Sequence, residues 1–168
     1  DEPGTRMSNM QYSPLAEIIG RVYWSAEVFN CNAPDTGNTE LLHLFATPEQ
    51  HERWLKPLLD GSIRSCFSMT EPDVASSDAT NICTTIRREG DEYVINGSKT
   101  FITNGYLADL VIVVAKTDPK AGAKGTSLFL VEADTPGFDK GKRLEKVGMK
   151  AQDTSELFFQ DVRIPKAN

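Results

Sequence analysis

The stretch Tyr93-Val-Ile-Asn-Gly-Ser-Lys-Thr-Phe-Ile-Thr-Asn-Gly105 decides the fold class, because it carries two turn signals close together. Asn-Gly pairs favour the two-residue turns of β-hairpins. Asn96-Gly97 and Asn104-Gly105 therefore predict a short strand at residues 98–103 with a turn at each end. Gly90-Asp91 marks a further turn just before the stretch. Such frequent turns are typical of an antiparallel sheet and argue against βαβ units.

Three runs downstream of this stretch also have the composition of β-strands. Residues 110–115, 127–132 and 155–164 are rich in β-branched and apolar side chains, and turn signals separate them. Together with the first stretch, these runs predict an antiparallel β-sandwich or β-barrel domain over residues 65–168.

The first third of the chain follows a helical period. Apolar residues recur three or four positions apart over residues 15–29, which predicts an amphipathic helix. Ser13 is expected to cap this helix, with Pro14 as its first residue. A turn-rich break at residues 30–38 precedes a shorter apolar helix at residues 39–46.

A capping box predicts the last helix. Thr47-Pro-Glu-Gln50 has a threonine followed three residues later by a glutamine, with proline at the first helical position. Pro57 is expected to kink this helix and Gly61 to close it. The predicted fold class is α+β, with residues 1–64 as the C-terminal part of an α-helical domain before the β domain. Because three short helices bury little apolar surface alone, we expect the chain to be a fragment.

Composition and charge exclude several functional classes. The chain has 18 basic and 24 acidic residues and a net charge of −6, so it has no positive surplus for binding nucleic acid. Its longest apolar run, residues 110–115, is far shorter than the roughly 20 residues that span a bilayer. No signal peptide is apparent at the start. The scattered Cys31, Cys66 and Cys83 fit a reducing, intracellular compartment better than a disulfide framework.

Three short motifs are weak candidates for chemistry. Glu40-Leu-Leu-His43 has the Glu-x-x-His spacing of di-iron bundles, but such a site needs a second copy, so we interpret His43 as a partly buried structural residue. With His51 as the only other histidine, we expect no metal site and no Ser–His–Asp arrangement. Asn96-Gly-Ser98 is a formal glycosylation sequon that the predicted turn explains. Gly122-Ala-Lys-Gly-Thr126 departs from the spacing of a phosphate-binding loop, so we expect a solvated loop.

Two loops are stronger candidates for a binding site. Residues 67–78 leave a predicted strand and enter a loop of small residues, and residues 101–105 end another strand in a tight turn. Both place hydroxyl groups beside an aromatic ring or a methionine at a loop, where ligand sites tend to lie. From the residues alone, a sheet edge with capping hydroxyls is the alternative.

Nine motifs follow one another along the chain: Met69-Thr-Glu-Pro72, Ser77-Asp78, Ile95-Asn-Gly97, Lys99, Phe101-Ile-Thr-Asn-Gly105, Val131-Glu-Ala-Asp-Thr-Pro-Gly137, Gly148-Met-Lys150, Asp153-Thr-Ser155 and Phe158-Phe-Gln-Asp-Val-Arg-Ile-Pro165. In this order they closely resemble the acyl-CoA dehydrogenase family. The resemblance covers essentially the whole chain, because residues 46–59 also fit the helix before the family's middle domain. Several linked motifs in one order make the signal specific.

The resemblance implies an FAD-dependent enzyme that oxidises an acyl-CoA to the trans-2-enoyl-CoA. In this family a glutamate removes the α-proton while the β-hydride passes to flavin N5. Met69 and Thr70 are expected at the pyrimidine edge of the flavin, where reduction places negative charge that hydrogen-bond donors stabilise. Phe101 is expected against the ring face and Thr103 at N5. The full set of expected FAD-binding residues is Phe67, Ser68, Met69, Thr70, Glu71, Ser76, Ser77, Phe101, Ile102 and Thr103.

The resemblance also implies the substrate and partners. Acyl-CoA is the expected substrate, with Ser77 facing its thioester chain and Lys124 as a candidate contact for a CoA phosphate. We expect an electron-transfer flavoprotein as electron acceptor, and a homodimer or homotetramer in the bacterial cytoplasm or the mitochondrial matrix. The family's catalytic glutamate is expected outside this chain, so no catalytic residue is assigned within it.

One loop departs from the family pattern. Residues 73–78, Asp-Val-Ala-Ser-Ser-Asp, are one residue longer than in many relatives and resemble a subgroup whose second loop tends to read Trp-Ser-Ser-Gly. Here the second loop reads Phe101-Ile-Thr-Asn-Gly105, so the acyl-chain length stays open. Two alternative functions also stay open. One is a related flavin oxidase that acts on an acyl-CoA or a nitroalkane with O₂, and the other is a non-catalytic β-module without flavin.

Overall fold

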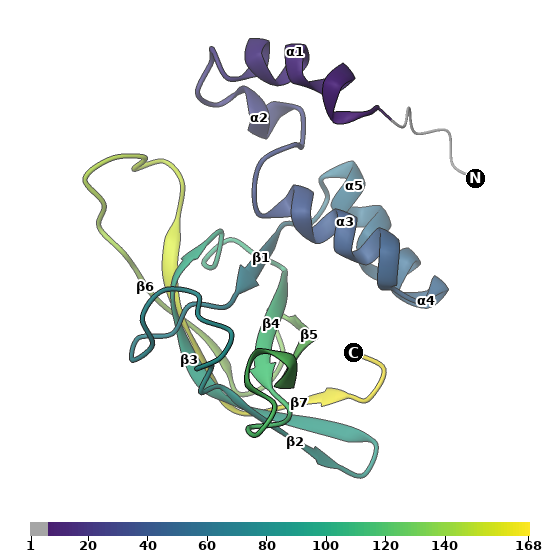
Figure 1. The fold of residues 1–168 in the computed structure, drawn as a ribbon, viewed down its shortest axis with the longest axis vertical. Helices are drawn as coiled ribbons and strands as arrows, with labels where there is room; N and C mark the ends of the chain where they lie inside the picture. The colour runs from purple at the N-terminus through teal and green to yellow at the C-terminus, as the bar shows by residue number, and fades with distance from the viewer. Residues whose placement is uncertain (1–6) are drawn as a thin grey trace.

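Helices occupy the first part of the chain and strands the rest in the computed structural model, which describes residues 7–168 (Figure 1). The helices are α1 (Asn9–Ile19), α2 (Ser25–Val28), α3 (Asp35–Phe45), α4 (Pro48–Gln50), the π-helical turn η1 (His51–Leu55) and α5 (Lys56–Asp60). The strands are β1 (Ser65–Ser68), β2 (Thr85–Glu89), β3 (Glu92–Thr103), β4 (Leu110–Lys116), β5 (Thr126–Glu132), β6 (Phe138–Arg143) and β7 (Thr154–Pro165), with a 3₁₀ turn η2 (Gly122–Gly125) before β5. This order confirms the α+β class.

The first helix begins earlier than expected. Ser8 is the N-cap in place of Ser13: its hydroxyl accepts a hydrogen bond from the Gln11 amide at 3.3 Å, and the Gln11 side chain accepts one from the Ser8 amide at 2.9 Å. Pro14 therefore lies inside α1, where it cannot donate to the Met10 carbonyl. The Ser13 hydroxyl donates to that carbonyl instead, at 3.1 Å, and so compensates for the missing bond.

The helix expected over residues 15–29 divides into the end of α1 and the single-turn α2. α1 buries none of its residues. Of the apolar residues in the predicted stripe, Leu15, Ile18, Val22 and Phe29 are exposed by at least two-fifths, whereas Ile19 and Ala26 are half-buried. The residues do follow a helical period in α1, but the described part of the chain leaves most of the apolar side of this helix exposed.

The remaining helices largely follow their sequence signals. α3 begins at Asp35, inside the segment expected to be a break. The capping box is confirmed, since the Thr47 hydroxyl accepts from the Gln50 amide at 3.3 Å and the Gln50 side chain accepts from the Thr47 amide at 2.9 Å. The irregularity expected at Pro57 takes the form of the π-helical turn η1 directly before α5. Gly61 closes α5 with a left-handed φ of +78°, as expected.

The strands form one mixed, curled sheet, a half-barrel, in the order β1-β4-β2-β3-β7-β6, with β5 paired to β4 (Figure 1). Most neighbours are antiparallel, as predicted. β1 instead runs parallel to β4, with Ser65 opposite Leu110 and Ser68 opposite Val113. The expectation of antiparallel pairing is therefore wrong for β1, because this strand enters from the helices and not from a hairpin. It is also wrong for β2 and β4, which pair in parallel at Thr85 and Lys116.

The turn predicted at Asn96-Gly97 does not exist, because both residues lie inside β3. The Asn96 side chain bridges to Asp161 in β7, donating to its carboxylate at 3.0 Å and accepting from its amide at 2.9 Å. A Cβ atom at Gly97 would lie 2.5 Å from the Thr84 hydroxyl and 2.9 Å from its Cα, so a glycine is needed for close approach. By contrast, Asn104-Gly105 does end β3 in a turn, as predicted.

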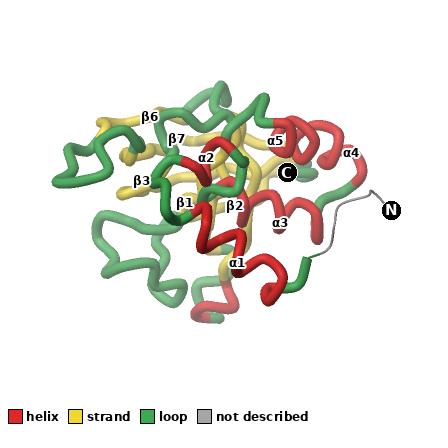
Figure 2. The backbone as a smooth tube through the Cα atoms, turned by 90° about the horizontal axis from the view of Figure 1, so that it is seen from above, coloured by secondary structure: helices red, strands yellow, loops and turns green. Residues whose placement is uncertain are grey.

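The later helices pack against the sheet and extend its core. One apolar cluster joins side chains of α3, η1 and α5 to side chains of β4 and β5: Leu42, Trp54, Leu55, Leu58, Leu110, Ile112 and Leu130. At the rim of this cluster, the Glu132 carboxylate accepts from the Trp54 indole at 2.9 Å and from Arg53 at 2.9 and 2.6 Å. Helices α3, α4 and α5 consequently lie together beside the strands (Figure 2).

The weak motif at residues 40–43 lies in α3. His43 is exposed, which corrects the expectation that it is partly buried, and its ring stacks on that of His51 with centroids 6.5 Å apart. Among residues 7–168, no group of three or more His, Cys, Asp or Glu side chains is arranged to hold a metal ion. Within the same residues, no helix has the length and hydropathy that crossing a membrane requires.

Candidate functional site

A β-bulge in β3 sets the direction of Phe101. Lys99 pairs with Leu157 and Ile102 with Ser155, so β3 carries one extra residue between these pairs. Phe101 has a φ of +58° and is 67% exposed. A left-handed conformation costs a non-glycine residue roughly 1–2 kcal/mol, and bulges of this kind re-aim side chains next to functional sites. The bulge presents the phenyl ring outward from the sheet.

The loop that follows β1 runs beside this bulge. The Thr100 amide donates to the Thr70 carbonyl at 2.9 Å, which joins the two segments directly. The hydroxyls of Thr70 and Ser77 are hydrogen-bonded at 2.8 Å. Ser76 has a φ of +58° and marks the turn that brings Ser77 back to Thr70. The two candidate loops, separate in sequence, therefore form one surface.

This surface is one wall of a groove of about 430 Å³. Seven of the ten residues expected to bind FAD line it: Phe67, Met69, Thr70, Ser77, Phe101, Ile102 and Thr103. The groove combines broad aromatic and aliphatic surface with three hydroxyl groups. Within residues 7–168 the hydroxyl of Thr103 has no hydrogen-bond partner, so it is available to a ligand.

Four residues singled out from the sequence lie outside the lining of the groove. Ser68 is fully buried, and its hydroxyl has no partner among the described residues. Glu71 is also buried, whereas Ser76 is exposed on the loop. Lys124 is exposed in the short turn η2. The binding roles expected of these four residues stay predictions.

Glu71 forms a buried ion pair with Lys99, with Oε1 and Nζ 2.9 Å apart. Burial alone would raise the pKa of Glu71, but hydrogen bonds from Thr84, Cys83 and Lys99 outweigh it and hold the pKa below its usual range. Burial lowers the pKa of the Lys99 ammonium, and the contact with Glu71 opposes this shift. The carboxylate is therefore ionised and fully engaged at neutral pH.

The sequence reasoning missed the opposite wall of the groove. This wall consists of Asn32, Ala33 and Pro34 from the segment before α3, together with Met149 and Gln152 before β7. Residues 30–38 carried only turn signals, and Met149 appeared in a resemblance motif without an assigned role. No local pattern identifies these residues, because tertiary contacts alone bring them to the groove.

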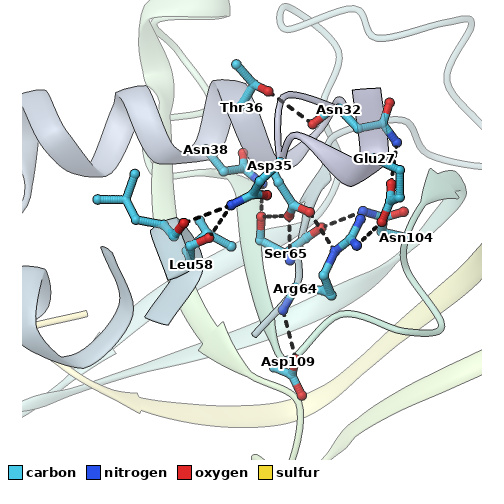
Figure 3. Close-up of polar contacts among 12 residues, drawn as sticks. Glu27, Asn32, Asp35, Thr36, Asn38, Leu58, Arg64, Ser65, Asn104 and Asp109 are labelled. Carbon is cyan, nitrogen blue, oxygen red and sulfur yellow. Dashed lines mark hydrogen bonds and ion pairs between the residues drawn. The ribbon is translucent and has the colours of Figure 1, made fainter. Parts of the chain in front are cut away.

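A polar network holds the segment before α3 against the sheet (Figure 3). The buried Asp35 carboxylate accepts hydrogen bonds from the amide and the hydroxyl of Ser65 at 2.7 and 2.6 Å, and from Arg64 Nε at 2.7 Å. Asn38 donates to the Ser65 hydroxyl at 2.8 Å, and the Asn104 side chain donates to the Ser65 carbonyl at 3.3 Å. The start of β1 thus joins α3 to the turn that ends β3.

Arg64 extends the same network to α2 (Figure 3). Its guanidinium contacts Glu27 as well as Asp35, and its amide donates to the Asp109 carboxylate at 2.9 Å. The hydrogen bond to Arg64 lowers the pKa of Glu27, although partial burial opposes the shift. Asn32 donates to Glu27 at 2.9 Å. One wall residue of the groove is therefore tied to α2 and, through Arg64, to β1.

A second cavity of about 280 Å³ adjoins the groove and shares Asn32, Met149 and Gln152 with it. Trp24 of the turn before α2 lines one side, and the buried Asp153 lines the other. One Asp153 oxygen accepts a hydrogen bond from an amide at 2.7 Å, while the other has no partner among the described residues. The hollow surface therefore continues from the groove toward α2.

Helices followed by a mixed half-barrel, with an aromatic and hydroxyl-lined groove at its edge, define the class of this chain as an α+β unit with a candidate binding groove. The family profile described as acyl-CoA dehydrogenase, middle domain, matches residues 66–162. The chain belongs to the acyl-CoA dehydrogenase family, which confirms the resemblance seen in its motifs.

Three known proteins illustrate this membership. The chain is 48% identical over 172 residues to a probable acyl-CoA dehydrogenase of Mycobacterium tuberculosis, covering 96% of this chain and 41% of that protein. A candidate acyl-CoA dehydrogenase from Mycobacterium abscessus has a TM-score of 0.91 and 46% identity, over 98% of this chain and 42% of that one. A glutaryl-CoA dehydrogenase from Mycobacterium smegmatis, in complex with FADH2, has a TM-score of 0.70 and 38% identity, over 77% and 32% respectively. The chain spans less than half the length of each.

Proposed function

We propose that the protein carrying these residues is an FAD-dependent acyl-CoA dehydrogenase that converts an acyl-CoA thioester to the trans-2-enoyl-CoA. The observation that carries the proposal is the groove, where seven of the ten residues expected at FAD come together from two separate loops. Membership of the family supports the reaction class, and the FADH2 complex of the similar glutaryl-CoA dehydrogenase supports the cofactor.

The side chains of the groove fit a flavin ring. An isoalloxazine is flat, apolar on its faces and polar along one edge, so it needs apolar surface beside a few hydrogen-bond donors. Phe67, Met69 and Phe101 offer that apolar surface, while Thr70 and Thr103 offer hydroxyl donors. Bound FAD would supply the acceptor for the hydride that leaves the substrate.

In the proposed reaction, the residues of this chain bind the flavin and orient the substrate. Phe101 packs against the ring face, where aromatic geometry adds about 0.5–1.5 kcal/mol to area burial. Thr70 and Thr103 donate hydrogen bonds toward the edge where negative charge develops, which favours the transition state over the ground state. Ser77 orients the thioester chain through its position beside Thr70, and Lys124 contacts a CoA phosphate.

The proton-abstracting base is proposed to come from outside this chain. A general base must lie within about 3 Å of the proton it removes. Among the described residues, none that lines the groove carries a carboxylate. Glu71 is engaged by Lys99, and Asp73 is exposed on the first loop outside the lining. The electron acceptor is proposed to be an electron-transfer flavoprotein, and the complete enzyme a homodimer or homotetramer.

Anaerobic titration with acyl-CoA tests this function. Octanoyl-CoA or palmitoyl-CoA added to the FAD-loaded full-length protein should bleach the flavin absorbance at about 450 nm. Residues 1–168 alone, supplied with FAD, should not bleach it, because the base is missing. Bleaching by residues 1–168 at an enzymic rate would place a base within this chain, with Glu71 and Asp73 as first candidates.

The same preparation separates the alternatives. Release of H₂O₂ in air, without reduction of an electron-transfer flavoprotein, would assign the protein to the flavin oxidases. A full-length protein that binds no FAD would be a non-catalytic β-module, and the proposal would be wrong.

A further inference from the structure

One buried ion pair joins the two loops of the groove below its surface. The side chains of Lys99 and Glu71 are 0% and 3% exposed, and no described pair is buried more completely. Glu71 directly follows Thr70 in the first loop, and Lys99 lies in β3, two residues before Phe101. Each member of the pair therefore belongs to a different part of the proposed flavin surface.

Lys99 uses all three of its ammonium hydrogens. Besides Glu71, Nζ donates to the Met69 carbonyl at 3.1 Å and to the Val114 carbonyl at 2.8 Å. Met69 lines the groove, whereas Val114 lies in the fully buried strand β4. The ammonium thus fixes a groove-lining residue to the most buried strand of the sheet.

Glu71 is held just as completely from the other side. Its carboxylate accepts hydrogen bonds from the Cys83 amide at 2.6 Å and from the Thr84 amide at 2.7 Å. Thr84 in turn packs directly on the bare Cα of Gly97. One carboxylate therefore joins the first loop to the segment just before β2, and that segment lies against β3 at Gly97.

Stability alone explains this arrangement poorly. Buried ion pairs gain little net free energy, because removing two charges from water offsets much of their attraction, and apolar replacements are often neutral or stabilising. A buried ion pair whose hydrogen-bonding groups all have partners holds the backbone atoms that it contacts in a defined geometry. Here those atoms belong to Met69, to its neighbour Thr70 and to the strand that carries the Phe101 bulge.

We propose that Lys99 and Glu71 are positioning residues for the flavin, which fix the first loop at a set distance from Phe101 and Thr103 without touching the ligand. This inference rests on the proposed function. It reassigns Glu71 from an expected contact of FAD to a support beneath the contacts, and it gives Lys99 a role.

Two substitutions and a matched control test the pair. Glu71→Gln keeps the shape of the side chain and removes its charge, Lys99→Met keeps the stem and removes the ammonium, and Arg163→Met breaks an exposed pair with Glu89 and Glu92 at the far end of the sheet. We expect Glu71→Gln to weaken FAD binding at least tenfold beyond any loss of folded protein, and to shift the flavin absorption band. Lys99→Met should do the same more strongly, and Arg163→Met should change neither property.

Hydrogen exchange of the flavin-free protein gives a readout that needs no ligand. The Thr100 amide, which donates to the Thr70 carbonyl, should exchange at least fivefold faster in Glu71→Gln, while amides in the β4–β5 ladder should keep their rates. A uniform increase across the sheet would mean that the pair only stabilises the fold.

The outcomes separate this inference from the proposed function. If the unsubstituted protein binds no FAD, the proposed function fails first. If it binds FAD and Glu71→Gln matches it in affinity, spectrum and Thr100 exchange, the positioning role alone is overturned. If neither variant folds, or if FAD affinity falls only in proportion to the folded fraction, the pair is a requirement of folding and the positioning role is likewise overturned.

Discussion

Helices α1 and α3 have the same length, eleven residues, but they stand in opposite relations to the rest of the molecule. α3 buries Asp35, Asn38 and Leu42, whereas α1 buries no residue. Two of the three buried residues of α3 are polar, and both reach Ser65 at the start of β1. α3 is therefore attached to the sheet by individual hydrogen bonds as well as by apolar packing.

The difference shows that a helical pattern of apolar residues does not by itself predict that the helix packs against the rest of the molecule. Both helices carry an apolar side, which is enough for the period to be recognised. Helices of this length are marginal alone in water, so their stability depends on what covers that side. For α3 the cover is β4 and its neighbours, whereas α1 buries none of its residues within the described part of the chain.

The largest expected effect is on the apolar anchor of α3. Leu42→Ala removes a side chain that is 1% exposed and should lower the free energy of unfolding by about 2–5 kcal/mol. Leu15→Ala, the matched change in α1 at a position 42% exposed, should change it by no more than about 0.5 kcal/mol. Urea denaturation of both variants measures the contrast. Equal losses would mean that α1 is docked as firmly as α3.

The polar anchor of α3 should have the next largest effect. Asp35→Ala leaves the amide and hydroxyl of Ser65 without an acceptor and should cost about 1–3 kcal/mol. It should also weaken FAD binding, because Asn32 and Pro34 lie directly before α3 in the groove wall. Glu17→Ala in α1 breaks only an exposed pair with Arg21 and serves as the control. Unchanged stability in Asp35→Ala would leave Leu42 as the main anchor.

Exposed apolar side chains of the groove and of α1 should also behave differently. Phe101→Ala should loosen FAD retention through dialysis by a few-fold to tenfold, because a ring contact of about 0.5–1.5 kcal/mol is lost along with apolar area. Ile18→Ala on α1, at similar exposure, should leave FAD retention unchanged. If Phe101→Ala keeps its full complement of FAD, Phe101 is a surface residue of the bulge and no flavin contact.

The smallest expected effect is the acid sensitivity of the contact between α2 and β1. The Glu27 pKa is lowered by Arg64, so its folded value lies below the unfolded value of about 4.3. A carboxyl group shifted in this direction adds stability above the unfolded pKa, and that stability is lost as the pH falls through the folded pKa. Exchange of the Phe29 amide, which donates to Ser25, should rise below pH of about 4, relative to a Glu27→Gln variant at the same pH. An equal pH response in both proteins would contradict this.

Sequence signals predicted the ends of helices and strands correctly where those ends depend only on interactions between neighbouring residues. The Thr47 capping box, the left-handed Gly61 and the Asn104 turn need only neighbouring residues, and all three are confirmed. Ser13 was misread because the Ser8 capping box lies one turn earlier, and Pro14 is tolerated inside the helix once a hydroxyl replaces its missing donor.

Tertiary contacts explain where the prediction failed. Asn96-Gly97 has the sequence of a hairpin turn, but Asp161 and Thr84 hold it inside a strand. The resemblance supplied seven groove residues, yet Asn32, Pro34 and Met149 could not be found because segments distant in sequence bring them there. Burial likewise separates Glu71 from its neighbours Met69 and Thr70, which no alternation pattern in a loop reveals.

The close contact at Gly97 has a consequence for how sequences of this fold can diverge. The space there admits a hydrogen atom and excludes a methyl group, because Thr84 occupies the position of the missing Cβ. Any descendant that acquires a side chain at this position must first move the segment around Thr84, and with it the amides that bind Glu71. If the proposed binding role of the groove holds, a side chain at Gly97 would be selected against through its effect on ligand binding, although Gly97 itself contacts no ligand. Changes at Gly97 and Thr84 would then be correlated during evolution.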